Sequence, residues 1–368
     1  MHAMLRSAVA WLALFPGAAL AASGGAATSP AATAQSGAHM PPAYFLFHIS
    51  RNGTELSRVR LTGVPPKTAP DIFPDMFAVA AGGKSIWVRM NTGDLIRLDS
   101  SGKEAWRGSG FRTVTRLVAN PNDGSCWVGS DEALLHVSAR GNVVCRRPDL
   151  AGWHPLALNP ADGSLWAWSD KGEVIHLTPS GRTLGRASLG GWTNDIASAE
   201  VNARDGSLWT VSASPRRIVQ LAGDGRVLAQ KAPLPEEVRV DSVNPRNGSY
   251  WGAVYWWSDE GGPHVGALAN VRVVHLTADG QEVGSTEPPE PWIRLFASPF
   301  DDSCWKVSDG GRLYHLDAKA RMIGKPLLYS VSSVTVEASD GSCWAVCEVP
   351  AGDLPAPPTP APAAGAGQ

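Results

Sequence analysis

The sequence predicts an all-β fold, a seven-bladed β-propeller, and three observations lead to it. A unit of the form Asn-Pro-x-Asp-Gly-Ser-x-Trp-Val recurs along the chain, followed by apolar-x-His-Leu and a turn that ends in Gly. The tryptophans of this unit are 39 to 54 residues apart, close to the period of a four-stranded propeller blade. With 39 Gly and 29 Pro in 368 residues, the composition also favours short strands and many turns. The repeat tryptophans are Trp87, Trp127, Trp166, Trp209, Trp251, Trp305 and Trp344.

Each unit contains four short strand patterns. In the clearest copy these are residues 155–158, 165–168, 174–178 and 183–187, and Asp162-Gly163 supplies the first tight turn. The residue before each repeat tryptophan is apolar, as in Cys126 and Leu165. A strand that is apolar on both faces must be covered on both, as it is in a blade between two neighbours.

The two ends of the repeat region complement each other. The unit at Trp344 lacks its second half, whereas residues 44–61 contain a second half without a tryptophan. We therefore expect these N-terminal strands to join the C-terminal blade, which removes the exposed sheet edge of an open array. The prediction is a propeller of seven four-stranded antiparallel blades over residues 43–350.

The segments outside the propeller have other compositions. Arg6, an apolar run over residues 8–14 and Ala19-Leu20-Ala21 are typical of a signal peptide, expected over residues 1–21. Residues 22–42 form an Ala/Ser/Gly leader that we expect to be flexible, and residues 351–368 a Pro/Ala-rich tail that we expect to be disordered. These features predict a secreted or periplasmic protein with no stable membrane span.

The Asp-Gly-Ser-x-Trp-Val, apolar-x-His-Leu and Gly unit resembles the repeat of the NHL and virginiamycin-B-lyase-like bacterial propellers. The resemblance covers nearly the whole predicted mature chain, but its motif is structural, and members of the group differ widely in function. It implies a six- or seven-bladed propeller. Enzymes of neighbouring groups carry metal-binding His, Glu or Asp residues in the central funnel, and no comparable set can be matched here.

Several residues that suggest chemistry are predicted to have structural roles. Five histidines occupy one repeat position where other units have Arg97 and Gln220, and a metal site would not tolerate that substitution. The five cysteines show no Cys-x-x-Cys motif, and we expect buried free thiols. The Asp-Gly-Ser turns lack the further carboxylates of a calcium loop. The histidines are His48, His136, His176, His275 and His315.

The connections between blades are the predicted place for a binding site, because the repeat pattern loosens there. Trp106, Trp153, Trp192 and Trp292 are expected in these connections, and an insertion after Trp251 is expected to form a loop with two adjacent tryptophans. Aromatic rings beside polar groups suit a sugar ring or a peptide. The alternative is that each tryptophan fills the seam between two blades. The candidate ligand-binding residues are Trp153, His154, Trp192, Asp195, Arg239, Asp241, Trp256, Trp257, Asp259, Trp292 and Arg294.

Two functions follow from these patterns. The favoured one is a non-catalytic binding or scaffold propeller for a glycan, peptide or envelope partner, with no catalytic residues. The alternative is a metal-dependent lyase or hydrolase with its site in the central funnel. No cofactor or metal site is predicted, and calcium is the one ion left open. A formal charge of −2 argues against nucleic acid as the partner, and we expect a monomer. The only contributors available to a metal site are Asp75, His154, Asp195, Asp241 and Glu337.

Overall fold

A computed structural model of the chain describes residues 42–64, 74–190, 199–213, 216–235, 238–257, 268–288, 293–308, 310–327, 329–350 and 353. These residues form 28 strands and two short 3-10 helices, η1 (Ala81–Gly83) and η2 (Pro148–Leu150). No helix among them is both long and apolar enough to cross a membrane. The predicted signal peptide, leader and almost all of the tail lie outside the described residues.

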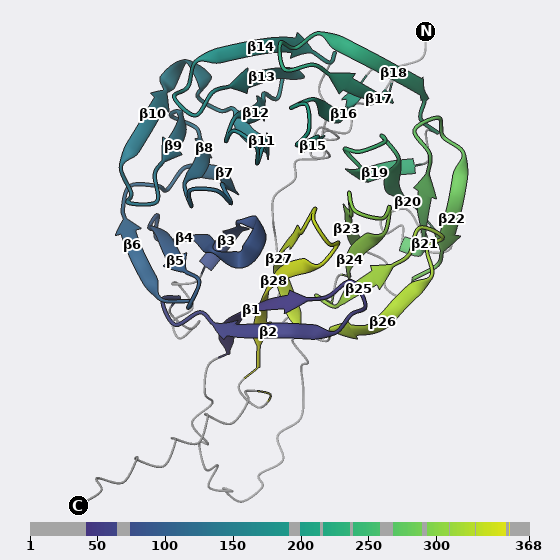
Figure 1. The fold of residues 1–368 in the computed structure, drawn as a ribbon, viewed down its shortest axis with the longest axis horizontal. Helices are drawn as coiled ribbons and strands as arrows, with labels where there is room; N and C mark the ends of the chain where they lie inside the picture. The colour runs from purple at the N-terminus through teal and green to yellow at the C-terminus, as the bar shows by residue number, and fades with distance from the viewer. Residues whose placement is uncertain are drawn as a thin grey trace, which may run out of the picture. The chain divides into compact units, whose positions relative to one another are not determined.

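The strands form seven four-stranded antiparallel sheets that follow one another around a ring (Figure 1). Blades 1 to 6 each contain four consecutive strands, the first innermost and the fourth outermost. Neighbouring innermost strands contact each other all round the ring. The predicted seven-bladed propeller is therefore confirmed.

The strand bounds follow the predicted units closely. Blade 1 contains β3 (Pro74–Val79), β4 (Ser85–Met90), β5 (Leu95–Asp99) and β6 (Glu104–Gly108). Blade 2 contains β7 (Val114–Ala119), β8 (Cys126–Ser130), β9 (Leu134–Val137) and β10 (Val143–Arg147). Blade 3 contains β11 (His154–Leu158), β12 (Leu165–Trp168), β13 (Glu173–Leu177) and β14 (Thr183–Ser188). Blade 4 contains β15 (Ala199–Val201), β16 (Leu208–Ala213), β17 (Arg216–Leu221) and β18 (Val227–Pro233).

The remaining blades include the longest strands and the ring closure. Blade 5 contains β19 (Val238–Val243), β20 (Tyr250–Trp257), β21 (Leu268–Leu276) and β22 (Glu282–Thr286). Blade 6 contains β23 (Ile293–Ala297), β24 (Cys304–Ser308), β25 (Leu313–Leu316) and β26 (Met322–Leu327). Blade 7 contains β27 (Ser330–Val336), β28 (Cys343–Val349), β1 (Ala43–Ile49) and β2 (Glu55–Arg60).

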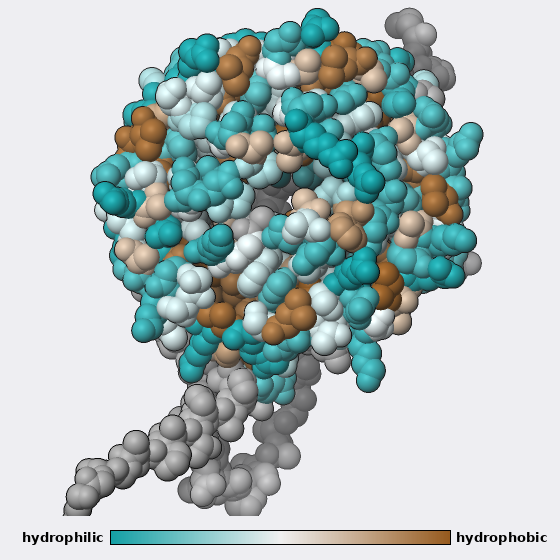
Figure 2. All heavy atoms as spheres, in the orientation of Figure 1, coloured by the Kyte–Doolittle hydropathy of each residue, from teal (hydrophilic) through white to brown (hydrophobic). Residues whose placement is uncertain are grey.

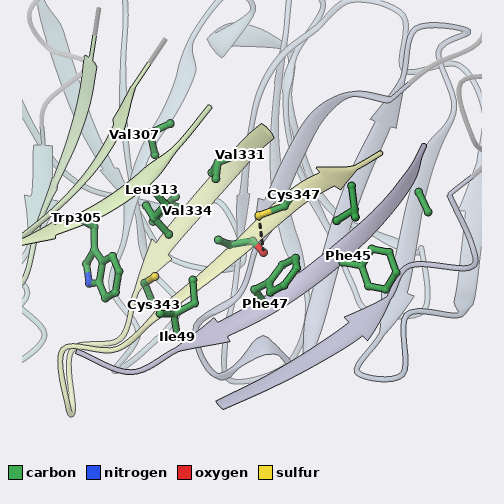
Figure 3. Packing of buried hydrophobic residues seen from close by; sticks show 13 residues of the cluster. Phe45, Phe47, Ile49, Trp305, Val307, Leu313, Val331, Val334, Cys343 and Cys347 are labelled. Carbon is green, nitrogen blue, oxygen red and sulfur yellow. Dashed lines mark hydrogen bonds between the residues drawn. The ribbon is translucent and has the colours of Figure 1, made fainter. Parts of the chain in front are cut away.

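Blade 7 closes the ring as predicted. β1 pairs antiparallel with β28, from Ala43 opposite Val349 to Ile49 opposite Cys343. The interface with blade 6 shows why this pairing is stable: the Phe45 and Phe47 side chains of β1 belong to one buried cluster with Trp305 of β24 (Figure 3). The N-terminal strands thus bury apolar surface and complete a sheet at the same time.

The repeat histidines tie neighbouring blades together, as the sequence predicts. In blade 3, the His176 ring stacks on Trp166 with centroids 4.4 Å apart. Its Nε2 hydrogen-bonds with Ser164 Oγ at 2.9 Å, and its Nδ1 donates to the carbonyl of Gly223 in blade 4 at 2.8 Å. His136 and His275 make the same bond to the following blade at 2.8 and 2.7 Å. Each of these rings therefore acts as a clamp between blades.

The other framework predictions also agree with the structure. In the Asp-Gly-Ser turns the aspartate accepts a hydrogen bond from the serine N–H, as Asp162 does from Ser164 at 2.9 Å, so these carboxylates stabilise turns. All five cysteines are buried and free. Burial raises the pKa of the Cys126 thiol well above its ordinary value, which keeps it protonated and unreactive.

Two sequence predictions about aromatic residues are wrong. Trp106 does not lie in a connection between blades: it belongs to the outermost strand β6, and its ring contacts Trp87 at 5.6 Å. The insertion after Trp251 does not begin as a loop at Tyr255. β20 continues through Trp257, with Trp256 opposite Asn270 on β21, so that blade 5 has a longer hairpin. Backbone pairing extends the strands beyond the repeat length, which the motif alone does not reveal.

Candidate binding face

The antiparallel blades place two kinds of segment on opposite faces of the ring. Turns between the first and second strands and between the third and fourth strands lie on one face, which we call the turn face. Turns between the second and third strands and the connections to the next blade lie on the other, which we call the connection face. His154 begins β11 at the connection face, whereas Glu337 follows β27 at the turn face. These two candidates for a shared metal ion are therefore at opposite ends of the innermost strands.

A polar cluster joins blades 2 and 3 at the connection face. His154 Nδ1 hydrogen-bonds with Thr115 Oγ1 of β7 at 2.9 Å. His154 Nε2 lies 3.4 Å from Asp170 Oδ1, in the turn between β12 and β13. The Trp168 ring lies against the imidazole, with centroids 4.9 Å apart. The imidazole side chain is 20% exposed and Asp170 58% exposed, so a partner at this face can reach both.

A small cavity lies beside Trp153 at the connection face of blade 3. It has a volume of about 220 Å³ and is lined by Trp153, Glu173, Val174, Arg186, Ala187 and Ser188. These residues come from the connection that follows η2 and from the ends of β13 and β14 that reach the connection face. The cavity thus offers one acidic, one basic and one hydroxyl side chain beside an indole ring.

Trp153 has a structural role in the seam between blades 2 and 3. It is 8% exposed and packs in a buried cluster with Trp127, Leu150 and Ile175 between blades 2 and 3. This placement corresponds to the alternative in which the tryptophan fills the seam. With 8% of its surface exposed, Trp153 has too little free area for a sugar ring to stack on.

Arg186, which lines the cavity, interacts electrostatically with an ion pair of the preceding connection. Arg147 forms an ion pair with Asp149 at 2.6 Å and also donates to the carbonyl of Gly181 in blade 3. The hydrogen bond from Arg147, together with its charge and that of Arg186, lowers the pKa of Asp149. Arg186 itself is exposed, and no ion pair is recorded for it within the described part of the chain. Its guanidinium is therefore available to an acidic ligand.

The other predicted residues are only partly brought together. Arg239 and Asp241 form an ion pair on β19, 3.1 Å apart, with Asp241 nearly buried. Arg294 lies on β23, in blade 6. The side chains of Trp256 and Trp257 are outside the described residues, although their backbone belongs to β20. Trp192, Asp195, Asp259 and Trp292 lie wholly outside the described residues.

The innermost strands carry charged residues that sequence reasoning did not select. Arg116 of β7, in blade 2, and Glu200 of β15, in blade 4, interact electrostatically although blade 3 stands between them. Both residues belong to innermost strands, which line the centre of the ring. Figure 2 shows a hollow at that centre. The signal available in the sequence was a charged residue inside an innermost-strand pattern, two or four residues before the turn.

Desolvation dominates the electrostatics of these central residues. It raises the pKa of Glu200 to about 7, against the opposing effect of Arg116. It also lowers the pKa of Arg294, even though the side chain is exposed. Within the described residues, no group of three His, Cys, Asp or Glu side chains is close enough to hold a metal ion.

Comparisons with known proteins add little to this geometry. No protein-family model and no curated protein matches the sequence. Among solved structures, the chain is similar to the crystal structure of BamB from Moraxella catarrhalis, with 15% identity and a TM-score of 0.45, over 82% of this chain and 90% of that one. The likeness is too weak to carry an argument about function, so the function has to be argued from the site.

Proposed function

We propose that this chain is an exported, non-catalytic binding propeller that engages a peptide segment of a partner protein at its connection face. The observation that carries the proposal is the cavity beside Trp153, which Glu173, Arg186 and Ser188 also line. Export rests on the signal-peptide pattern that ends at Ala19-Leu20-Ala21.

The size and lining of the cavity favour a peptide over a glycan. A volume of about 220 Å³ is below the usual range for small-molecule sites and suits a single side chain. Stacking on a sugar requires an open aromatic face, and Trp153 is only 8% exposed. An acid, a base and a hydroxyl at the rim can instead pair with the polar groups of a peptide.

The neighbouring polar cluster extends this surface toward the centre of the ring. His154 and Asp170 lie on the same face, and His154 also hydrogen-bonds with Thr115 of blade 2. Trp168 contacts the imidazole and packs against the core shared by blades 3 and 4. A peptide that placed one side chain in the cavity could therefore bond with the imidazole or the carboxylate at its next residues. This arrangement offers a pocket for specificity and a polar surface for orientation.

A peptide-display experiment tests the proposal. The purified propeller is used to select from a random-peptide phage library, and enriched peptides are titrated against Arg186→Gln and Glu173→Gln variants. Loss of one charged partner should weaken binding about tenfold or more. Arg182→Gln is the matched control, because Arg182 is an exposed residue of blade 3 in a turn on the opposite face.

Two results would contradict the proposal. One is a set of peptides whose affinity is unchanged in Arg186→Gln and Glu173→Gln. The other is selective binding to a glycan array without any enriched peptide, which would assign the face to carbohydrate. Melting temperatures of the variants, compared with the parent protein, separate loss of the site from loss of the fold.

A further inference from the structure

The cavity beside Trp153 is lined by two opposite charges that do not pair with each other. Glu173 lies opposite Ser188 in the pairing of β13 with β14, and Arg186 lies opposite Ile175. Because residues two apart on a strand share a face, the Glu173 and Arg186 side chains are on the same face of blade 3. Both are exposed and both line the cavity. No ion pair joins them in the part of the chain that the structure describes.

The equivalent residues of blade 1 do form an ion pair. Asp94 and Arg107 occupy the repeat positions of Glu173 and Arg186: each acid follows the glycine of the turn between the second and third strands, and each arginine lies opposite an isoleucine of the third strand. Asp94 and Arg107 are 3.0 Å apart. The repeat therefore supports a closed pair at this position, and blade 3 differs by keeping the two charges apart on the walls of a cavity.

The nearby acid of the preceding connection leaves Arg186 available. Asp149 interacts electrostatically with Arg186, but both of its carboxylate oxygens accept hydrogen bonds from Arg147, at 2.8 and 2.6 Å. Arg186 and Glu173 thus remain as an unpaired cation and an unpaired anion beside one volume of about 220 Å³.

This arrangement disfavours a charged side chain in the cavity. A carboxylate that approached Arg186 would also face Glu173, and an ammonium or guanidinium group that approached Glu173 would also face Arg186. A carboxamide carries no charge, and it has a carbonyl oxygen with two acceptor sites and an NH₂ group with two donors. Its oxygen can accept from Arg186 and from the hydroxyl of Ser188, while its NH₂ group donates to Glu173.

We propose that the cavity selects a glutamine or asparagine side chain of the bound peptide. This inference rests on the proposed function, because it names the residue that the peptide segment places in the cavity. The amide joins the two charges that the fold keeps apart, and each charge rejects one class of ionised side chain. Trp153, Val174 and Ala187 line the rest of the cavity and suit the methylene groups of the same side chain.

The peptides enriched on the propeller test the selection directly, by fluorescence anisotropy of labelled copies. They should share a glutamine or asparagine at one position. Replacing that residue with glutamate or with lysine should weaken binding to the parent protein about tenfold or more. The preference should change with the charges of the cavity: Glu173→Gln should bind the glutamate peptide more tightly than the parent protein does, and Arg186→Gln should do so for the lysine peptide.

Arg107→Gln is the matched control, because it removes the equivalent arginine of blade 1 and should leave every affinity unchanged. Peptides that lose affinity in Arg186→Gln and Glu173→Gln but share no carboxamide residue would overturn the selection and leave the binding propeller standing. Unchanged preferences in both cavity variants would overturn it as well. A library without any enriched peptide would overturn both the selection and the proposed function. The peptide substitutions are measured on the parent protein, so they do not depend on the folding of a variant.

Discussion

His176 allows the clamps between blades to be tested quantitatively. Replacing it with alanine removes the hydrogen bonds to Ser164 and to the Gly223 carbonyl, and the stacked ring on Trp166. Ser164 is 1% exposed, so its hydroxyl would lose a buried partner, at a cost of about 1 to 3 kcal/mol. The second bond and the ring contact add roughly 1 kcal/mol each. His176→Ala should therefore lower the free energy of unfolding by about 3 to 5 kcal/mol.

Glutamine provides the matched variant, because the chain already uses it at this position. In blade 4, Gln220 donates to Ser207 Oγ at 3.0 Å, the bond that His176 makes with Ser164 in blade 3. His176→Gln should keep this bond and lose the one to the next blade. The expected loss of unfolding free energy is roughly half of that for alanine.

The same residue predicts a pH dependence with a definite sign. Burial lowers the pKa of His176 below its ordinary value of 6.5, and His136, His275 and His315 shift in the same direction. The unfolded chain then binds protons more readily than the folded one. The contribution of the neutral histidines to the free energy of unfolding should be fully present above pH 6.5 and decrease as the pH falls below that value. Replacing all four histidines with glutamine should flatten this part of the profile.

Urea unfolding followed by tryptophan fluorescence measures both effects, at neutral pH and at several acidic values. Equal losses of unfolding free energy in His176→Ala and His176→Gln would contradict the clamp, because the retained bond to Ser164 would then contribute nothing. It is also refuted if the fourfold glutamine variant loses stability in acid as steeply as the parent protein.

Three further predictions concern the framework. Gly225→Ala places a Cβ 2.2 Å from the Arg186 carbonyl oxygen at a φ of +86°, and should lower the free energy of unfolding by several kcal/mol. Gly152→Ala, with a φ of +73° and open space around the Cβ, should lower it by only about 1 kcal/mol, and melting curves of the two variants test the difference. None of the five buried cysteines should react with maleimide in the native protein, and all five should react in urea, as counted by mass spectrometry. Labelling without urea would contradict their burial. Deleting residues 44–61 removes β1 and β2 and should abolish cooperative unfolding, so a compact, cooperative product would contradict ring closure.

Much of the fold could be predicted because its signals are local. Asp162 and Ser164 form a turn within three residues, and Trp166 follows at a fixed distance, so each unit is recognisable alone. The framework role of His176 could also be predicted, since Arg97 and Gln220 replace it elsewhere and donate to the equivalent serines. The ends of the outermost strands were harder to predict. A period of about forty residues does not separate an outermost strand from the connection that follows it, which is why Trp106 was misplaced.

The candidate site was predicted only in part. Trp153 and His154 lie at the connection face, as expected from their place between two units. Glu173 and Arg186, which complete the cavity, sit inside regular strand patterns and carry no signal of their own. Thr115 is hydrogen-bonded to His154, although 39 residues separate them in the chain.

The number of blades, the ring closure and the roles of the repeated Trp, His and Ser residues could be predicted from the sequence alone, because each depends on contacts within one unit or between consecutive units. The tertiary structure was needed to show that the charge of Arg116 acts on the pKa of Glu200. These residues belong to blades 2 and 4, which are not neighbours, so their separation depends on the angle through which the whole ring curves. Interactions across a closed ring are set by the sum of all its interfaces, and a repeat motif describes only one interface at a time.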